Sequence, residues 1–263
     1  MLLCPHCGTT LQKTNNAYSC ENGHCFDIAK SGYVNLYLNA GHGRHGDDKA
    51  MVRARTDFLN KGFYQSLADK LIEKATLLSP SVLVDAGCGE GYYTSQLAQA
   101  LPQTHIIGFD LSKDALNISA KRMKSAEFAV ASTAKMPLGS NDIDLVLNVF
   151  SPYFYEEFAR VLKPGGYLLR VIPLEKHLHE LRQVVYDKPY DNEVPDLTTP
   201  GFQLVDREDL CYTISLDNQE DIEHLFLMTP YYYKTGRSDQ EKLTRLNNLN
   251  LSIQFGILTY KKT

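Results

Sequence analysis

The stretch Val82-Leu-Val-Asp-Ala-Gly-Cys-Gly-Glu-Gly-Tyr-Tyr-Thr94 decides the fold of this chain. Its first three residues are apolar and predict a buried strand. Three glycines then alternate, which lets the backbone turn sharply and approach a ligand without obstruction by side chains. These are Gly87, Gly89 and Gly91. The residues from Tyr92 to Leu101 predict a helix, so a ligand is expected where the strand ends and the helix begins, as in open α/β sheets.

The spacing of the glycines indicates which nucleotide-like ligand binds. The dinucleotide pattern requires a glycine three positions after the second one, and here that position is Tyr92. The pattern Asp85-x-Gly-x-Gly-x-Gly91 instead resembles the first motif of the class I S-adenosylmethionine (SAM) methyltransferases. We therefore expect SAM as a cofactor. The alternative is a glycine-rich turn with no ligand, which would lose backbone entropy without any gain in packing.

A second strand, predicted from His105 to Asp110, supports this interpretation. It ends in an acid about 20 residues beyond the glycines, and in nucleotide-binding βαβ units such an acid binds the ribose hydroxyls. SAM carries such a ribose. Ser112 is expected to cap a helix that runs from Lys113 to about Lys124. The alternative for Asp110 is an ordinary turn residue at the end of a strand.

Five further segments predict strands, and a Pro-Gly-Gly turn at 164–166 resembles one that recurs in the same superfamily. The segments are 128–131, 144–150, 162–171, 211–216 and 252–260. Together the seven strands predict an α/β fold with a Rossmann-like, mostly parallel sheet, that of a class I SAM methyltransferase. One departure is at Ser132, near which many of these enzymes carry an acid that contacts adenine.

Composition limits the classes of protein that fit. The 263 residues suffice for one large domain and a small appendage, with 43% hydrophobic and 22% charged residues. A net charge of −4 counts mildly against a strongly nucleic-acid-binding surface. No apolar run approaches the roughly 20 residues of a membrane helix, and no secretory signal is seen at the N-terminus. We expect a cytoplasmic protein with no membrane partner.

Four of the six cysteines lie in the first 25 residues, which in a cytoplasmic protein suggests a metal rather than disulfides. Cys4-Pro-His-Cys7 is followed after twelve residues by Cys20-Glu-Asn-Gly-His24-Cys25, a separation usual for structural zinc. Spacing alone leaves the fourth ligand open between His24 and Cys25, with His6 a weaker candidate. Unmetallated thiols and a redox CxxC motif are the alternatives. A closed set of four ligands makes a structural role the expected one.

The cysteine spacing, His24-x-Phe-Asp27 and Gly32-Tyr-Val-Asn-Leu36 closely resemble the bacterial 23S ribosomal RNA guanine-N1 methyltransferases. The resemblance continues through Arg55-Thr-Asp-Phe-Leu59, the glycine motif, Lys163-Pro-Gly-Gly166 and His177-Leu-x-Glu-Leu181, and so covers most of the chain. It implies a zinc-ribbon-like N-terminal domain whose ligands match Cys4, Cys7, Cys20 and His24.

The resemblance also implies contacts with the cofactor, at positions matching Tyr64, Tyr93, Thr94 and His177. Tyr64 has the alternative of packing a helix against the sheet, and His177 that of a surface helix residue. Family members often carry a small residue and a cysteine after the proline that follows the fourth strand. Here the segment is Ser151-Pro-Tyr-Phe-Tyr-Glu-Glu157, so the target position could differ.

Three parts are expected along the chain: a zinc-binding domain (1–37), a linker with the start of a connecting helix (38–57) and a methyltransferase domain (58–263). The helix is predicted to start near Asp47 or Asp48. Cationic side chains in the linker and helix could follow RNA phosphates, although a solvated face is as good an interpretation for each. They are His42, Arg44, His45, Lys49, Arg53 and Arg55.

The sequence thus predicts methyl transfer from SAM to N1 of a guanine in a hairpin loop of 23S rRNA. A small-molecule methyltransferase and a non-catalytic RNA-binding protein are the alternatives. N1 carries a proton that must leave, and Asn148, Tyr153 and Glu156 are candidate acceptors among which no spacing selects. Pro230-Tyr-Tyr-Tyr-Lys234 offers aromatic rings for base stacking, although packing is the commoner role. The resemblance implies a homodimer.

Overall fold

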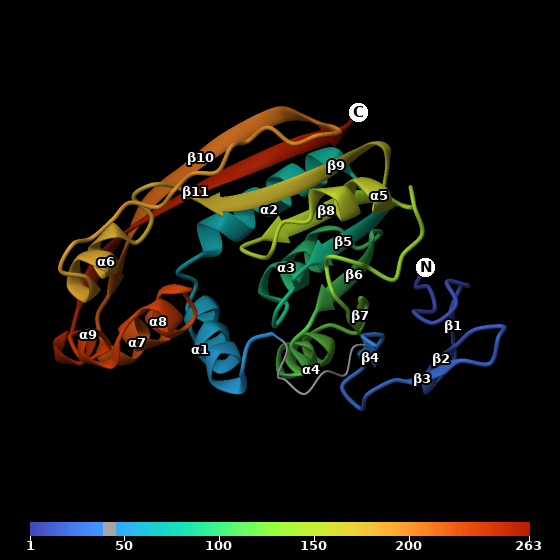
Figure 1. The fold of residues 1–263 in the computed structure, drawn as a ribbon, viewed down its shortest axis with the longest axis horizontal. Helices are drawn as coiled ribbons and strands as arrows, with labels where there is room; N and C mark the ends of the chain where they lie inside the picture. Colours follow the sequence, from blue (N-terminus) through green and yellow to red (C-terminus); the bar gives the residue numbers. More distant parts are fainter. Residues whose placement is uncertain (39–45) are drawn as a thin grey trace.

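Strand β5 (Val82–Ala86) lies within an eight-stranded sheet in the computed structural model, which describes residues 1–38 and 46–263 (Figure 1). The strand order is β10-β11-β9-β8-β5-β6-β7-β4. All neighbours are parallel except on the two sides of β11, which alone runs against the others. The other strands are β4 (Val34–Asn35), β6 (His105–Asp110), β7 (Glu127–Val130), β8 (Ile143–Val149), β9 (Leu162–Pro173), β10 (Phe202–Leu216) and β11 (Leu249–Lys262).

The seven predicted strands are therefore confirmed, with β10 beginning nine residues earlier than expected. The eighth, β4, was not predicted, because two residues are too few to carry a hydrophobic period. It comes from the N-terminal region and pairs with β7 at the edge of the sheet. The sheet thus extends beyond the methyltransferase segment.

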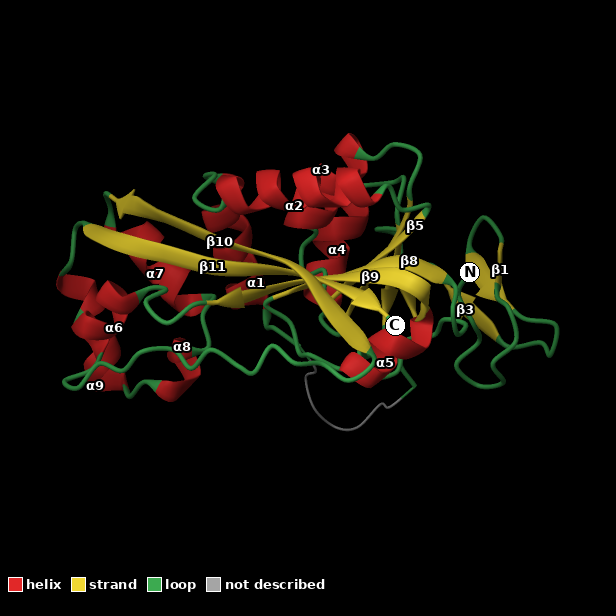
Figure 2. Cartoon of the chain, turned by 90° about the horizontal axis from the view of Figure 1, so that it is seen from above, coloured by secondary structure: helices red, strands yellow, loops and turns green. Residues whose placement is uncertain are grey.

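The two faces of the sheet are covered differently. Helices α2, α3 and α4 lie on one face, and α5 lies on the other (Figure 2). The alternation of buried side chains along the strands explains this: Leu83 belongs to the apolar cluster under α2 and α3, whereas Val84 belongs to the cluster under α5. The helices are α1 (Lys49–Asn60), α2 (Gln65–Leu78), α3 (Tyr92–Ala100), α4 (Lys113–Arg122), α5 (Tyr155–Val161) and α6 (His179–Val185).

Between β10 and β11 the chain forms a group of short helices beside α1 (Figure 1). They are α7 (Gln219–Leu227), α8 (Tyr231–Lys234), α9 (Arg237–Gln240) and the 3₁₀ helix η1 (Leu243–Arg245). An ion pair between Lys61 and Asp221 ties this group to the end of α1. Asp48 caps α1 through the N–H groups of Ala50 and Met51, which confirms the predicted helix start.

The N-terminal residues form a small antiparallel sheet of β1 (Gln12–Lys13), β2 (Ala17–Ser19) and β3 (Cys25–Asp27). We call residues 1–37 the zinc unit. It docks on strand β7, where Tyr18 donates to Glu127, and on the loop after β7, where the Leu3 N–H donates to the Pro137 carbonyl at 2.8 Å. Its buried side chains join the same apolar cluster as those under α5. The division into a zinc-binding domain (1–37), a linker (38–57) and a methyltransferase domain (58–263) stays a prediction.

Among the described residues, no helix combines the length and the apolar character that crossing a membrane requires.

Candidate cofactor and metal sites

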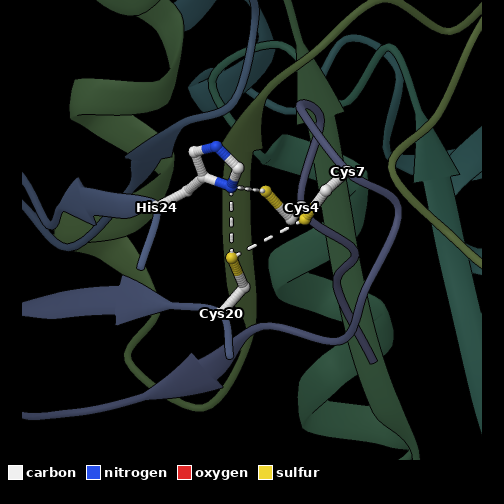
Figure 3. Close-up of side chains that lie close together, drawn as sticks. All are labelled: Cys4, Cys7, Cys20 and His24. Carbon is white, nitrogen blue, oxygen red and sulfur yellow. Dashed lines mark hydrogen bonds between the residues drawn. The ribbon is translucent and has the colours of Figure 1, made fainter. Parts of the chain in front are cut away.

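Four side chains from two loops of the zinc unit converge on one point (Figure 3). Their ligand atoms, three Sγ and the Nδ1 of His24, all lie within 4.8 Å of one another. The residues are Cys4, Cys7, Cys20 and His24. Separations are 3.7 Å from Cys7 to Cys20, 3.3 Å from Cys20 to His24 and 3.5 Å from Cys4 to His24. A tetrahedral zinc ion needs donors about 3.5–3.8 Å apart, so the four fit it.

The fourth ligand is resolved by this geometry in favour of His24. The thiol of Cys25 is exposed and lies outside the group of four. His6 stacks its ring on that of His24 at 4.7 Å and so packs beside the site. With four protein donors and no open position, the zinc is structural and stabilises the fold of the segment.

The glycine turn borders a cavity of about 310 Å³ at the carboxyl ends of the parallel strands. Its walls come from the turn itself, α1, the segments after β6, β7 and β8, and Met228 near α8. It is lined by Gly46, Asp47, Arg55, Leu59, Tyr64, Asp85, Gly87, Cys88, Gly89, Glu90, Tyr93, Asp110, Leu111, Ala131, Thr133, Val149, Phe150, Ser151, Pro152 and Met228. The cavity is thus where the sequence predicts the cofactor.

The three glycines of the turn have positive φ angles, which favour glycine. A Cβ on Gly87 would lie 2.4 Å from that of Ser151, and one on Gly91 would lie 2.8 Å from that of Ser119. Contacts with Ser151 and Ser119 therefore exclude a side chain at two of these positions, even without a bound ligand. The turn is packed tightly enough to hold its N–H groups in place.

The predicted acid Asp110 fixes the cofactor turn. Its carboxylate accepts hydrogen bonds from the Gly89 N–H at 2.9 Å and the Ser112 N–H at 2.7 Å. Burial raises the pKa of Asp110, although these bonds oppose the shift. The carboxylate thus joins β6 to the turn after β5, where a ribose would meet both.

Asp85 is the most strongly perturbed acid of the cavity. Burial raises its pKa to about 7, against the effect of a 2.6 Å hydrogen bond that the Thr94 hydroxyl donates to it. Asp110 and Glu90 add like charge and also raise the pKa. A cation bound in the cavity would stabilise the ionised form of Asp85.

Arg55 lies in the cofactor cavity rather than on a surface that could follow RNA phosphates. Its guanidinium lines the cofactor cavity and donates to Glu90 at 2.8 Å and to Asp47 at 2.5 Å. The phosphate-path hypothesis is therefore wrong for Arg55, because two carboxylates already hold it beside the glycine turn. Lys49 and Arg53 are exposed on α1, whereas His42, Arg44 and His45 lie outside the described residues. Sequence reasoning missed Glu90 and Asp47, whose pairing with Arg55 no local pattern signals.

The four positions implied by the family resemblance fall into two groups. Tyr64 and Tyr93 line the cavity, and the buried Tyr93 hydroxyl has no hydrogen-bond partner among the described residues. Thr94 points to Asp85, and the ring of His177 packs on Phe255 at 4.6 Å. Neither is among the residues that line the cavity. Their contact with the cofactor stays a prediction.

The His177 ring is neutral, because burial and the charge of Arg182 lower its pKa to about 3. Its Nδ1 accepts a hydrogen bond from the Gln254 N–H at 3.3 Å. His177 is therefore not a surface helix residue, which was the alternative interpretation. It holds the aromatic packing behind the cavity.

None of the three candidate proton acceptors is among the residues that line the cavity. The Asn148 amide donates to the Ser151 hydroxyl at 2.5 Å, and the Tyr153 hydroxyl pairs with Thr199. Glu156 is exposed on α5. Phe150, which sequence reasoning missed, stands at the rim instead, 46% exposed and at a left-handed φ of 51°. A strained aromatic beside a ligand cavity is a common mark of function.

The residues present fit SAM. Four carboxylates and one guanidinium line the cavity, an excess of negative charge that suits the sulfonium and ammonium of SAM. The orphaned Tyr93 hydroxyl offers a hydrogen bond, and the Asp110 carboxylate faces the place of a ribose. Asp85, Asp110, Tyr93 and the turn at Gly87–Gly91 would hold the cofactor.

Two family models match the chain. Residues 2–38 match the zinc ribbon described as "RlmA, N-terminal", and residues 83–166 match "Methyltransferase domain". Among solved structures, the [4+2]-cyclase SpnF superposes with a TM-score of 0.51 at 19% identity, over 75% of this chain and 80% of that one. This likeness shows the fold alone, since one fold hosts many reactions.

Curated relatives match almost the whole chain. The 23S rRNA (guanine(748)-N(1))-methyltransferase of Streptomyces fradiae is 31% identical over 97% of this chain and 95% of its own. A candidate 23S rRNA (guanine-N(1)-)-methyltransferase, YxjB of Bacillus subtilis (strain 168), is 30% identical over 98% and 96%. With a zinc ribbon, a class I fold and a SAM cavity, this chain belongs to the 23S rRNA (guanine-N1)-methyltransferase family.

Proposed function

We propose that this enzyme transfers a methyl group from SAM to N1 of a guanine in a hairpin loop of 23S ribosomal RNA. The observation that carries the proposal is the extent of the similarity to the Streptomyces fradiae enzyme, which includes the zinc unit and the cofactor domain together. A small-molecule methyltransferase would share the cofactor cavity but has no need of the zinc unit.

SAM supplies a methyl group on a sulfonium, and the protein has mainly to orient the guanine for in-line attack. Bound by Asp85, Asp110, Tyr93 and the glycine turn, SAM would supply an electrophilic methyl group, and the protein would have to present N1 to it and provide an acceptor for the N1 proton. Because N1 lies on the Watson–Crick edge, the base must be unpaired or extruded. Hairpin loops present such bases, which agrees with the proposed substrate.

Phe150 supports this mode of approach. Its ring is exposed at the cavity rim and rests on Phe255 at 5.0 Å, which itself contacts Tyr64 and His177. Phe255 thus supports the Phe150 ring, which is exposed where a base would enter the cavity. Proteins commonly hold unpaired bases by stacking them on aromatic rings. Phe150 rather than the 230–234 segment is the stacking residue that we propose.

Two tyrosines of α8, Tyr231 and Tyr232, are used in packing within the protein. Tyr231 is buried and its hydroxyl donates to Asn192 at 2.8 Å and accepts from Arg182 at 2.7 Å. Tyr232 packs on Phe226, and none of the three α8 tyrosines lines the cavity. Packing, the commoner interpretation, accounts for Tyr231 and Tyr232.

A ribosomal RNA substrate and bacterial relatives support a cytoplasmic location for the enzyme, and the family resemblance supports a homodimer. Light scattering on the zinc-loaded protein tests the dimer. A mass of two chains is expected, and an active species of one chain would contradict it.

Nucleoside mass spectrometry of 23S rRNA tests the proposed function, with cells that have or lack this gene. Deletion is expected to remove 1-methylguanosine from one hairpin loop, and purified protein with SAM is expected to restore it. Unchanged rRNA methylation, together with retained SAM binding by the protein, would contradict the proposal.

A further inference from the structure

A second cavity, of about 630 Å³, lies between the zinc unit and the large sheet. We call it the knuckle groove, because the Cys4–Gly8 knuckle forms one wall. It is lined by Leu3, Cys4, Pro5, His6, Cys7, Gly8, Leu36, Tyr37, Leu38, Ala131, Ser132, Lys135, Met136, Pro137, Leu138 and Arg160. Its volume is within the usual range for a small-ligand site.

The knuckle groove adjoins the cofactor cavity. Ala131 lines both, Ser132 lines the groove, and Thr133 lines the cofactor cavity, so one turn after β7 separates them. An RNA that lies across this turn would reach both the cofactor cavity and the groove. The two cavities are close enough to receive neighbouring parts of one RNA.

The two cavities differ in their acidic side chains. Four acids line the cofactor cavity, whereas no acid is among the described residues that line the knuckle groove. In a chain of net charge −4, an acid-free concavity is unexpected for a solvated surface. It suits an anion.

Lys135 supplies the free cation of the groove. It is exposed, and its ammonium makes no hydrogen bond or ion pair within the described residues, whereas Arg160 is already paired with Glu157 at 2.6 Å. Arg160 also donates to the carbonyls of Leu138 and Met136, so it shapes the wall. A phosphate is therefore attracted to the Lys135 side of the groove.

The knuckle side offers a different surface. Zinc with three thiolates keeps one formal negative charge there, which disfavours a phosphate. The side chains of Leu3, Pro5 and Leu38 present apolar area instead, with the exposed His6 beside them. This end suits a nucleobase rather than the backbone that carries it.

We propose that the knuckle groove binds an unpaired nucleotide next to the target guanine, with its phosphate at Lys135 and its base against the knuckle. The inference rests on the proposed function and names a subsite that the cofactor chemistry does not require. It gives the zinc unit a direct part in choosing the substrate, because the neighbour of the target base is read at its surface.

Charge reversal at Lys135 tests the phosphate contact, with the full-length, zinc-loaded protein and a hairpin RNA substrate. Lys135→Glu is expected to raise the Kd for RNA about 10-fold, and Lys135→Ala to lower the salt slope of log Kd by about 0.7, the effect of one single-strand phosphate. The matched control is Lys188→Ala, an exposed lysine near α6. SAM affinity should stay unchanged in all three variants.

A Kd and a salt slope for Lys135→Glu within twofold of those of the unmodified enzyme would overturn the inference. So would normal methylation of naked RNA by Lys135→Glu with failure on intact ribosomal particles, because the groove would then receive a ribosomal protein. In both cases the proposed function stands. It fails instead if the unmodified enzyme makes no 1-methylguanosine.

Photocrosslinking tests the base contact, with 4-thiouridine placed on either side of the target guanine. Adducts are expected on peptides 3–8 or 131–138 for one of the two positions. Adducts confined to the helices α7–α9 would assign the RNA path to the opposite side of the cofactor cavity and overturn the proposal.

Discussion

The two cavities of this enzyme meet at Ala131, yet their linings share little chemistry. The cofactor cavity gathers Asp47, Asp85, Glu90 and Asp110 around one guanidinium, whereas the knuckle groove has Lys135 and no acid among its described lining residues. We therefore propose that the cationic cofactor binds in the first cavity and part of the polyanionic RNA in the second. The zinc unit supplies a wall of the knuckle groove and none of the cofactor cavity, so the proposed RNA subsite depends on the zinc unit whereas the cofactor cavity does not.

Removal of zinc ligands should have the largest effect and should separate the two cavities, because it disrupts a wall of the knuckle groove and leaves the cofactor cavity in place. Cys4→Ser with Cys7→Ser is expected to abolish zinc binding and to lower RNA methylation at least about 100-fold, since zinc binding provides the folding energy of such segments. SAM affinity should change only a few-fold. Metal analysis, methylation rate and calorimetry measure the three effects.

The matched control is Cys25→Ser with Cys211→Ser, two exposed cysteines outside the ligand group. This pair should keep one zinc ion per chain and full activity. Loss of zinc in the control, or full methylation by the zinc-free variant, would refute the assigned ligands or their role.

Asp110→Asn should weaken the cofactor cavity alone. The carboxylate holds the Gly89 and Ser112 N–H groups, and hydrogen bonds to charged groups contribute about 1.5–3 kcal/mol each. We expect SAM affinity to fall about 10- to 100-fold while RNA affinity is kept, as measured by calorimetry and by a binding assay on the hairpin. Asp217→Asn, at an exposed acid far from the cavity, is the control. An equal loss of RNA affinity would mean that the two cavities are not separable.

The sequence predicted the parts of these sites that local patterns encode. The strand that ends at Asp85, the alternating glycines and the acid of β6 lie within one βαβ unit, so spacing alone located them. The zinc ligands lie in two short loops, and there spacing indicates Cys4, Cys7 and Cys20, whereas the choice of His24 needs the family resemblance. Fixed local geometry makes such sites readable from one chain.

The rest depends on contacts between distant residues. Arg55 and Glu90 are 35 residues apart, and nothing in either segment indicates their ion pair, so the sequence leaves Arg55 open between a phosphate path and a solvated helix face. Phe150 was missed because its importance comes from a left-handed backbone and from support by Phe255, over 100 residues away. Strand β4 was missed because its pairing with β7 is tertiary.

Phe150→Ala should lower kcat/KM for the hairpin RNA about 10-fold, because base stacking on an aromatic side chain contributes about 1–3 kcal/mol. SAM affinity should remain within twofold. Phe154→Ala is the matched control, since that ring is 39% exposed but does not line the cavity. If both variants retain full activity, the target base does not stack on Phe150.

The smallest expected effect is on the pH dependence of SAM affinity. Asp85 has its pKa raised to about 7 in the free protein, and a bound cation favours the ionised form. Binding therefore releases a proton, and affinity should rise a few-fold from pH 5.5 to 7.5 and then level off. Calorimetry in two buffers of different ionisation enthalpy measures both the affinity and the proton release.

Asp85→Asn should flatten this profile. The sign for stability is opposite: a buried acid with a raised pKa stabilises the free protein in its neutral form, and that contribution is lost as the pH rises through about 7. A SAM affinity that falls with rising pH in the unmodified enzyme would contradict the assignment of Asp85 to the cation.

Primer extension on 23S rRNA treated in vitro tests the central claim most directly. A methyl group at guanine N1 blocks the Watson–Crick edge, so reverse transcriptase stops one nucleotide before it. We predict a single new stop at one hairpin-loop guanine, dependent on SAM and on zinc-loaded enzyme. A transcript without any new stop, from enzyme that binds SAM and zinc, would contradict the account.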